Sequence, residues 1–102
     1  MGYKTTLTPK GRDYGVDVIA RKGEEVIAIQ CKKYRANNPV GNRDVQRLLG
    51  AMQYRNIRAT HSILITTSYF TVSAREQAEE CSIELWDGRE LKKMIRKYLM
   101  KI

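Results

Sequence analysis

Long hydrophobic runs are missing from this sequence. No apolar stretch approaches the ~20 residues that a membrane-spanning helix needs, and the N-terminus, MGYKTTLTPKGR, lacks the apolar core of a secretory signal. Cysteine and histidine are scarce too, because Cys31, Cys81 and His61 are the whole set and have no metal-ligand spacing. These absences argue against a membrane span, a zinc site or a disulfide. They predict a cytoplasmic protein with free thiols.

The chain also lacks internal repeats, low-complexity segments and any linker rich in proline, glycine and serine. With 102 residues, 42% of them hydrophobic, we expect one folded domain over residues 1–102. A domain of this length buries about two-thirds of the surface that its unfolded chain exposes. The sequence therefore predicts a single core.

Acidic residues are the minority among the charged side chains. Nineteen lysines and arginines stand against eleven aspartates and glutamates, which gives a formal net charge of +8. Each lysine or arginine that neutralises a phosphate releases condensed counterions, so this excess favours a polyanionic partner. The simpler alternative is that the charge only keeps the protein soluble.

Short β-branched runs alternate with segments of helical period along the chain. Strands are expected at residues 3–7, 16–21, 26–32, 62–67 and 83–86. The second and third of these strands form a hairpin around Gly23, and we expect both of their faces to be covered.

Three helix starts are expected from capping residues. Asn42 is a candidate cap for the first helix, Ser73 with Glu76 forms a possible capping box for the second, and Asp87 begins the third. A hairpin followed by alternating helices and strands predicts an α/β fold with a mixed central sheet.

Polar side chains interrupt the two apolar strands of the hairpin. Asp17 lies in its first strand, and Gln30 and Lys32 share one face of its second strand because strand side chains alternate. A loop of two or four residues around Gly23 places Asp17 opposite Ala28 or Gln30, on that same face. A three-residue loop without a bulge turns Asp17 to the other face.

One carboxylate, one amide oxygen and one ammonium would then meet at the end of a two-stranded ribbon. A carboxylate in a strand interior is costly unless it is paired or binds a cation. An oxygen-lined corner suits Mg²⁺ or Mn²⁺, and a nearby lysine can stabilise charge that develops on a phosphate. The alternative is an ion pair between Asp17 and Lys32, with Gln30 bonded to a backbone group.

The segments around these residues resemble a known nuclease family. Gly15-Val16-Asp17 and Gln30-Cys31-Lys32-Lys33-Tyr34 are similar to the Mrr-like catalytic domain of restriction endonucleases, a branch of the PD-(D/E)xK superfamily in which Gln-x-Lys replaces Glu-x-Lys. The likeness continues in order through Val40-Gly41, Leu49-Gly50-Ala51, residues 65–71 (ITTSYFT) and residues 85–91 (LWDGREL). It implies a restriction-endonuclease-like mixed central β-sheet flanked by helices.

The resemblance also implies roles for individual residues. Asp17 would ligate a Mg²⁺ or Mn²⁺ ion, with Gln30 and the backbone carbonyl of Cys31 completing the shell, and Lys32 would be the catalytic lysine. Asp13 matches an acidic position often seen before the motif aspartate, although a turn aspartate is more often only a cap.

Members of the family usually begin with a helix that packs on the sheet and often contributes a glutamate to the metal site. This sequence starts at residues 1–3, where the first strand is expected. We therefore expect a domain without the leading helix. It would be a fragment, or have that face covered by a partner chain, or work with fewer carboxylates.

Basic residues flank the proposed corner. Arg12, Lys33 and Arg35 are near it in sequence, and Arg43 and Arg47 lie on the polar face of the first expected helix. Contacts to phosphates would position a DNA duplex without reading its sequence, and an ordinary solvated face is the alternative.

The resemblance predicts a metal-dependent DNA endonuclease. Two alternatives remain, a catalytically weak or inactive DNA-binding domain and a structure-selective nuclease of the Holliday-junction type. Because cutting both strands needs two sites, a homodimer is also expected.

Overall fold

The computed structural model describes residues 2–8, 15–54 and 57–99, with side chains described as far as residue 97. Five strands form one sheet in the order β1-β2-β3-β4-β5. The strands are β1 (Lys4–Leu7), β2 (Val18–Lys22), β3 (Glu25–Lys32), β4 (His61–Thr66) and β5 (Ile83–Trp86). The helices in the described part are α1 (Asn42–Met52), α2 (Val72–Glu79) and α3 (Gly88–Leu99).

The sheet is mixed, as expected from the order of the elements. β1, β2 and β3 pair antiparallel, whereas β4 runs parallel to both β3 and β5. Parallel neighbours need a crossover connection, and α1 and α2 supply it between β3 and β4 and between β4 and β5. The α/β prediction is confirmed.

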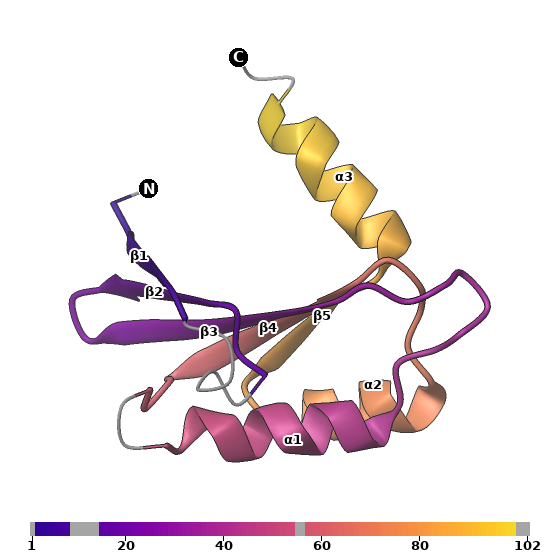
Figure 1. Cartoon of the computed structure of the whole chain (residues 1–102), viewed down its shortest axis with the longest axis horizontal. Coiled ribbons are helices and arrows are strands. Elements are labelled where there is room, and N and C mark those ends of the chain that lie inside the picture. Colours follow the sequence, from indigo (N-terminus) through magenta and orange to yellow (C-terminus); the bar gives the residue numbers. More distant parts are fainter. Residues whose placement is uncertain (1, 9–14, 55–56, 100–102) are drawn as a thin grey trace.

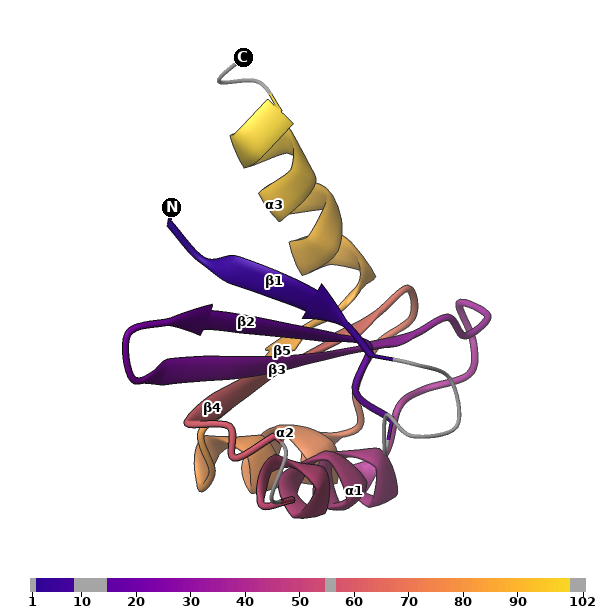
Figure 2. The ribbon, with the colours of Figure 1, turned by 60° about the vertical axis from the view of Figure 1, so that its left-hand side comes forward.

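The core lies between the sheet and the two crossover helices, which cover the same face (Figures 1 and 2). Helix α1 buries one apolar stripe at helical spacing, formed by Val45, Leu48, Ala51 and Met52. Leu48 of α1 and Leu64 of β4 are both fully buried in this core. Helix α1 thus packs on the sheet at β4.

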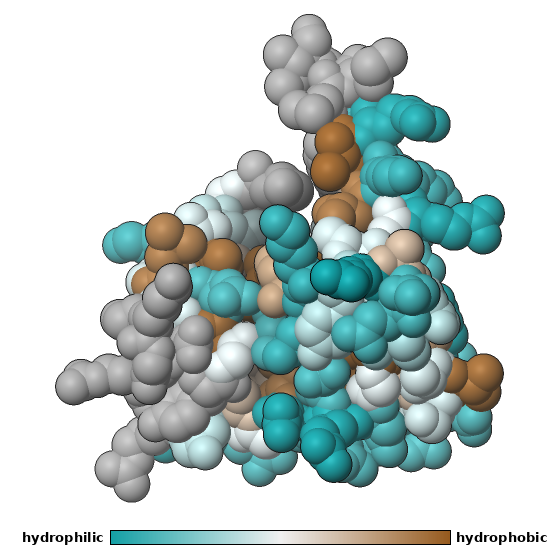
Figure 3. Space-filling view, turned by 45° about the vertical axis from the view of Figure 1, so that its right-hand side comes forward, coloured by the Kyte–Doolittle hydropathy of each residue, from teal (hydrophilic) through white to brown (hydrophobic). Residues whose placement is uncertain are grey.

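The opposite face of the sheet is less covered. Ile27 and Ile29 of β3 are only half-buried there, so the prediction of strands covered on both faces holds for the α1–α2 side alone. Helix α3 leaves the end of β5 and projects away from the sheet (Figures 1 and 2). Its apolar side remains accessible, as the brown side chains along the helix in Figure 3 and the 48% exposure of Ile95 show.

Two of the expected helix caps are wrong by one or two residues. Helix α1 takes Gly41 as its N-cap, so Asn42 is its first helical residue. Helix α2 is capped by Thr71, whose hydroxyl accepts a 3.1 Å hydrogen bond from the Ala74 N–H. The residue before this cap, Phe70, pairs with Val40 in an isolated β-bridge, so the helix begins directly after the bridged residue and its cap.

The third cap is confirmed. Asp87 Oδ1 accepts a 2.8 Å hydrogen bond from the N–H of Glu90 and so satisfies a backbone donor in the first turn of α3. In the described part of the chain, none of the helices has both the length and the apolar character to cross a membrane.

Candidate active site

The hairpin turn has an even number of residues. Lys22 pairs with Glu25, which leaves Gly23 and Glu24 as a two-residue loop. Gly23 has φ of +59°, a left-handed conformation that such tight turns favour. The same register pairs Val18 with Ile29 and brings the residue before Val18 level with the end of β3.

Asp17 is the residue at that position. Its backbone N–H donates a 2.8 Å hydrogen bond to the carbonyl of Ile29, which continues the pairing beyond the end of β2. Its carboxylate oxygen Oδ2 accepts a 2.7 Å hydrogen bond from the N–H of Cys31. A short bond from an amide to a carboxylate holds the charged group in place, so the Asp17 carboxylate is fixed beside β3.

Gln30 is buried at the same end of β3, with 5% of its surface exposed. Its amide side chain lies against Gly15, where an added Cβ would come within 2.5 Å of Nε2. Its oxygen Oε1 is buried and finds no hydrogen-bond donor among the residues that the structure describes. A buried oxygen without a partner is costly. Gln30 Oε1 is therefore free to coordinate a cation.

Lys32 pairs with a carboxylate that the sequence did not single out. Its Nζ lies 3.7 Å from Oδ1 of Asp44, in the first turn of α1. Oδ2 of the same carboxylate accepts a 3.5 Å hydrogen bond from the hydroxyl of Tyr34. Among the described residues, Lys32 therefore pairs with Asp44 and not with Asp17.

The sequence analysis did not predict that Asp44 lies beside Lys32 and Tyr34. Asp44 has the ordinary place of an acid in a helix first turn, and nine residues of loop separate β3 from α1. Only the packing of α1 on β4, the strand beside β3, brings the two together, and no fixed spacing in the sequence predicts that packing.

The donor set fits a hard divalent cation. It comprises the Asp17 carboxylate, the unpaired Gln30 Oε1 and backbone carbonyl oxygen at the end of β3. Among the described residues there is no group of three or more histidine, cysteine, aspartate and glutamate side chains that could hold a metal. Oxygen donors of this kind suit Mg²⁺ or Mn²⁺, which are usually held by one or two carboxylates.

The Cys31 side chain points to the other face of β3. Partial burial raises the pKa of its thiol above the ordinary value, and the negative charge of Asp17 raises this pKa further. Cys31 and Leu91 of α3 both line a pocket of about 250 Å³ at the ends of β3 and β4.

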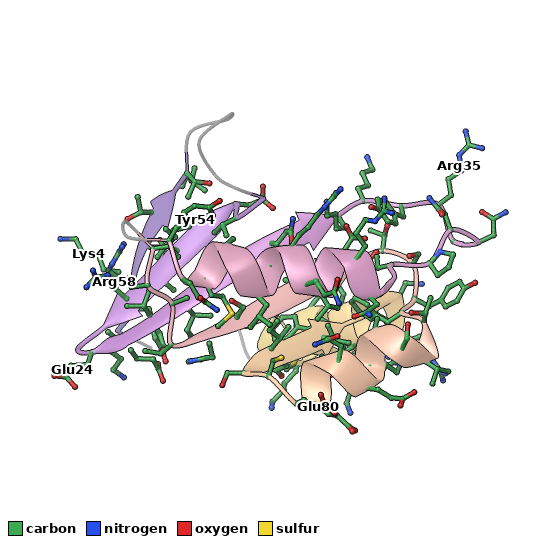
Figure 4. All side chains as sticks on the ribbon, turned by 90° about the horizontal axis from the view of Figure 1, so that it is seen from below. Lys4, Glu24, Arg35, Tyr54, Arg58 and Glu80 are labelled. Atoms are coloured by element: carbon green, nitrogen blue, oxygen red, sulfur yellow. The ribbon has the colours of Figure 1, made fainter. Side chains whose placement is uncertain are left out.

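The four expected phosphate-contacting residues that the structure describes are exposed. Lys33 and Arg35 lie in the loop after β3, and Arg43 and Arg47 lie on the outer face of α1. Figure 4 shows Arg35 at one end of the molecule and Lys4 and Arg58 at the other.

Two expected site residues, Arg12 and Asp13, lie outside the described part of the chain.

Thr66 and Thr67, at the end of β4, make strand-end hydrogen bonds. The hydroxyl of Thr67 bonds to the carbonyl and the N–H of Tyr34, and Thr66 bonds to Ser68.

The mixed sheet and its helices form a restriction-endonuclease-like fold. Residues 1–95 match the family Mrr_cat, described as restriction endonuclease, which covers far more than half of the sequence. The chain belongs to this restriction endonuclease family. No curated protein matches it in sequence.

Solved structures share the fold. The DNA modification-dependent restriction endonuclease AspBHI superposes with a TM-score of 0.76 at 26% identity, covering 94% of this chain and 26% of its own. The MspJI restriction endonuclease, solved in complex with a 27-mer oligonucleotide, gives a TM-score of 0.71 at 21% identity, covering 96% of this chain and 24% of its own. A repair endonuclease from Pyrococcus abyssi gives 0.56 at 17% identity, covering 85% and 38%. The chain thus spans about a quarter of AspBHI and MspJI.

Proposed function

We propose that residues 1–102 are one catalytic domain that hydrolyses DNA phosphodiester bonds with Mg²⁺ or Mn²⁺. The observation that carries the proposal is the buried Gln30 Oε1, which has no donor among the described residues and lies one residue from the Cys31 amide that fixes Asp17. Membership of the restriction endonuclease family supports the same chemistry. We place the protein in the cytoplasm, where a DNA substrate would be reached.

The ion would be held by the Asp17 carboxylate, Gln30 Oε1 and the backbone carbonyl of Cys31, with Asp13 as a further candidate. When bound, it would polarise the scissile phosphate and lower the pKa of a coordinated water. The chain itself positions two of these ligands, because the Cys31 N–H holds Asp17 and Gly15 lies close against the Gln30 amide.

Lys32 would stabilise the negative charge that grows on the phosphate during attack. It shares the α1 side of β3 with Gln30 because the two alternate with Cys31. The exposed Lys33, Arg35, Arg43 and Arg47, together with Arg12, would contact backbone phosphates and position the duplex. Two copies in a homodimer would place one site on each strand.

The test uses the purified chain, supercoiled plasmid and Mn²⁺. Wild type is expected to nick the plasmid, and Asp17→Ala and Lys32→Ala are expected to lose this activity while they keep the wild-type circular dichroism spectrum and melting temperature. Equal cutting by the variants would mean a contaminating nuclease and would overturn the proposal. Four-way junctions cut far faster than linear duplex would assign the domain to the structure-selective class.

One observation favours a second candidate, a DNA-binding domain with little or no cleavage. In the described part of the chain, the corner has a single carboxylate, that of Asp17, since Asp44 is engaged by Lys32 and Tyr34. This candidate predicts steeply salt-dependent DNA binding without added metal, and no cleavage with any divalent ion.

A further inference from the structure

Asp44 lies between the side chains of Lys32 and Tyr34 and contacts both. Its side chain is 13% exposed, and it presents one carboxylate oxygen to Lys32 Nζ at 3.7 Å and the other to the Tyr34 hydroxyl at 3.5 Å. An acid in the first turn of a helix is already favoured by the helix dipole. Both oxygens nevertheless face residues at the end of β3 and in the loop that follows it.

Tyr34 holds the other side of this carboxylate from a fixed position. The Tyr34 N–H donates a 3.1 Å hydrogen bond to the hydroxyl of Thr67, and the same hydroxyl donates a 2.7 Å bond to the Tyr34 carbonyl. The Tyr34 ring also packs against the core. Its phenol is thus anchored through β4 and the core, and it anchors Asp44 in turn.

Lys32 needs such a guide more than the other residues of the corner. Asp17 is fixed by a backbone amide and Gln30 by close packing against Gly15. The ammonium of Lys32 ends a flexible four-carbon stem, and its side chain is 25% exposed. Without a partner it would sample several rotamers, only some of which reach a phosphate at the corner.

We propose that Asp44 is the positioning residue for Lys32. It holds the ammonium at the α1 side of β3 before DNA arrives, so that Lys32 meets the scissile phosphate without a search. The inference rests on the proposed nuclease function, in which Lys32 acts on that phosphate. Asp44 contacts the lysine and not the substrate, and its own negative charge repels DNA.

The charge argument separates positioning from binding. Removal of the Asp44 charge releases Lys32 and also removes a repulsive group from the approach of the phosphates. Asp44→Asn is therefore expected to lower kcat for plasmid nicking about 10–100-fold, with Kd for DNA measured in Ca²⁺ unchanged or lower. Asp44→Glu keeps the charge and is expected to recover part of kcat. Glu76→Gln removes an equal charge from an exposed site on α2 and is expected to change neither value.

Three kinetic outcomes would overturn the inference. The first is an unchanged kcat in Asp44→Asn. The second is a fall in kcat that is explained by a lower melting temperature of that variant. The third is a kcat in Asp44→Glu that is no higher than in Asp44→Asn. Each requires a wild type that cuts DNA, so each leaves the proposed function intact.

A second measurement does not depend on activity. Zero-length carbodiimide coupling is expected to join the Lys32 amine and the Asp44 carboxylate in an amide, detected by peptide mass spectrometry and lost in Asp44→Asn. Absence of this amide in the wild type would overturn the pairing. A wild type that cleaves no DNA with any divalent ion would overturn the proposed function, and with it the role of Asp44 in catalysis, even where the amide forms.

Discussion

The backbone N–H of Cys31 donates a 2.7 Å hydrogen bond to Oδ2 of Asp17 across the open end of the β2–β3 hairpin. This bond ties the carboxylate to the strand that also carries Gln30 and Lys32. Cys31 therefore has two separate effects, since its amide holds Asp17 while its thiol lies on the opposite face.

The thiol of Cys31 gives a prediction for pH. Its pKa is raised, by partial burial first and by the Asp17 charge second. The folded state therefore holds the thiol proton more tightly than the unfolded state, and this stabilisation is lost as pH rises through the folded pKa. Because alkylation proceeds through the thiolate, iodoacetamide should modify Cys31 more slowly than a model cysteine peptide at pH 8–9.

The Asp17→Asn variant tests whether the Asp17 charge raises the pKa of the Cys31 thiol. It removes the charge and should lower the Cys31 pKa, so that the midpoint of the rate against pH shifts downward. Peptide mass spectrometry of the time course gives both rates. A midpoint that does not move would contradict the proximity of the two groups.

Gly15→Ala should destabilise the protein by about 1–3 kcal/mol. Gly15 has φ of +88°, and a Cβ there would approach Gln30 Nε2 within 2.5 Å. The measurement is urea unfolding followed by circular dichroism. The cleavage rate of the folded fraction should fall as well, because the Gln30 amide must move.

Gly50→Ala is the control for that variant. Gly50 lies inside α1, where an added Cβ would meet no side chain or other segment within 4 Å, so alanine should stabilise the helix by about 0.5–1 kcal/mol. Equal effects of the two substitutions would show that Gly15 has no special conformation.

Gln30→Glu tests the ligand role of the unpaired oxygen without relying on cleavage. A buried carboxylate is costly without a cation, so the variant should melt below wild type in EDTA. Mn²⁺ should then raise its melting temperature by more than it raises that of wild type, because binding to the folded state alone is stabilising. The half-saturating Mn²⁺ concentration should fall about tenfold with the added charge.

Gln53→Glu makes the same chemical change at an exposed position just past α1. It should show no difference in melting between EDTA and Mn²⁺ beyond that of wild type. If Gln30→Glu behaved like this control, Gln30 would not be a metal ligand.

Arg35→Ala should weaken DNA binding and lower the salt dependence. Arg35 is exposed in the loop at the site end of the molecule, and one lost phosphate contact should reduce the slope of log K against log salt by about 0.9. Fluorescence anisotropy with a labelled duplex measures both. Lys4→Ala, at the far end in Figure 4, should leave the slope unchanged, and equal losses would place the duplex elsewhere.

Much of this fold could be predicted from the sequence because each element carries its own local signal. Short β-branched apolar runs predict the strands, and β5 spans Ile83–Trp86 as expected. Helix α2 was placed late because Ser73 and Glu76 imitate a capping box. The actual cap, Thr71, comes directly after Phe70, whose bridge to the distant Val40 has no local sequence signal.

The site was predictable only in part, for a different reason. Asp17, Gln30 and Lys32 are linked by a short hairpin, so strand geometry relates them, although Gly23 allowed loops of either parity. Asp44 reaches Lys32 through the packing of α1 on β4, where Leu48 and Leu64 are buried together. Such a contact depends on tertiary structure and has no fixed spacing in sequence.

The two-residue turn at Gly23 and Glu24 limits how this domain can change in length. Side chains on a strand alternate between the two faces of the sheet. An insertion of one residue in the turn would therefore move the side chains of one strand to the opposite face relative to those of its partner. Insertions or deletions of two residues preserve the alignment. Descendants of this sequence that retain the corner should therefore differ at this turn in even steps, unless a bulge absorbs the odd residue.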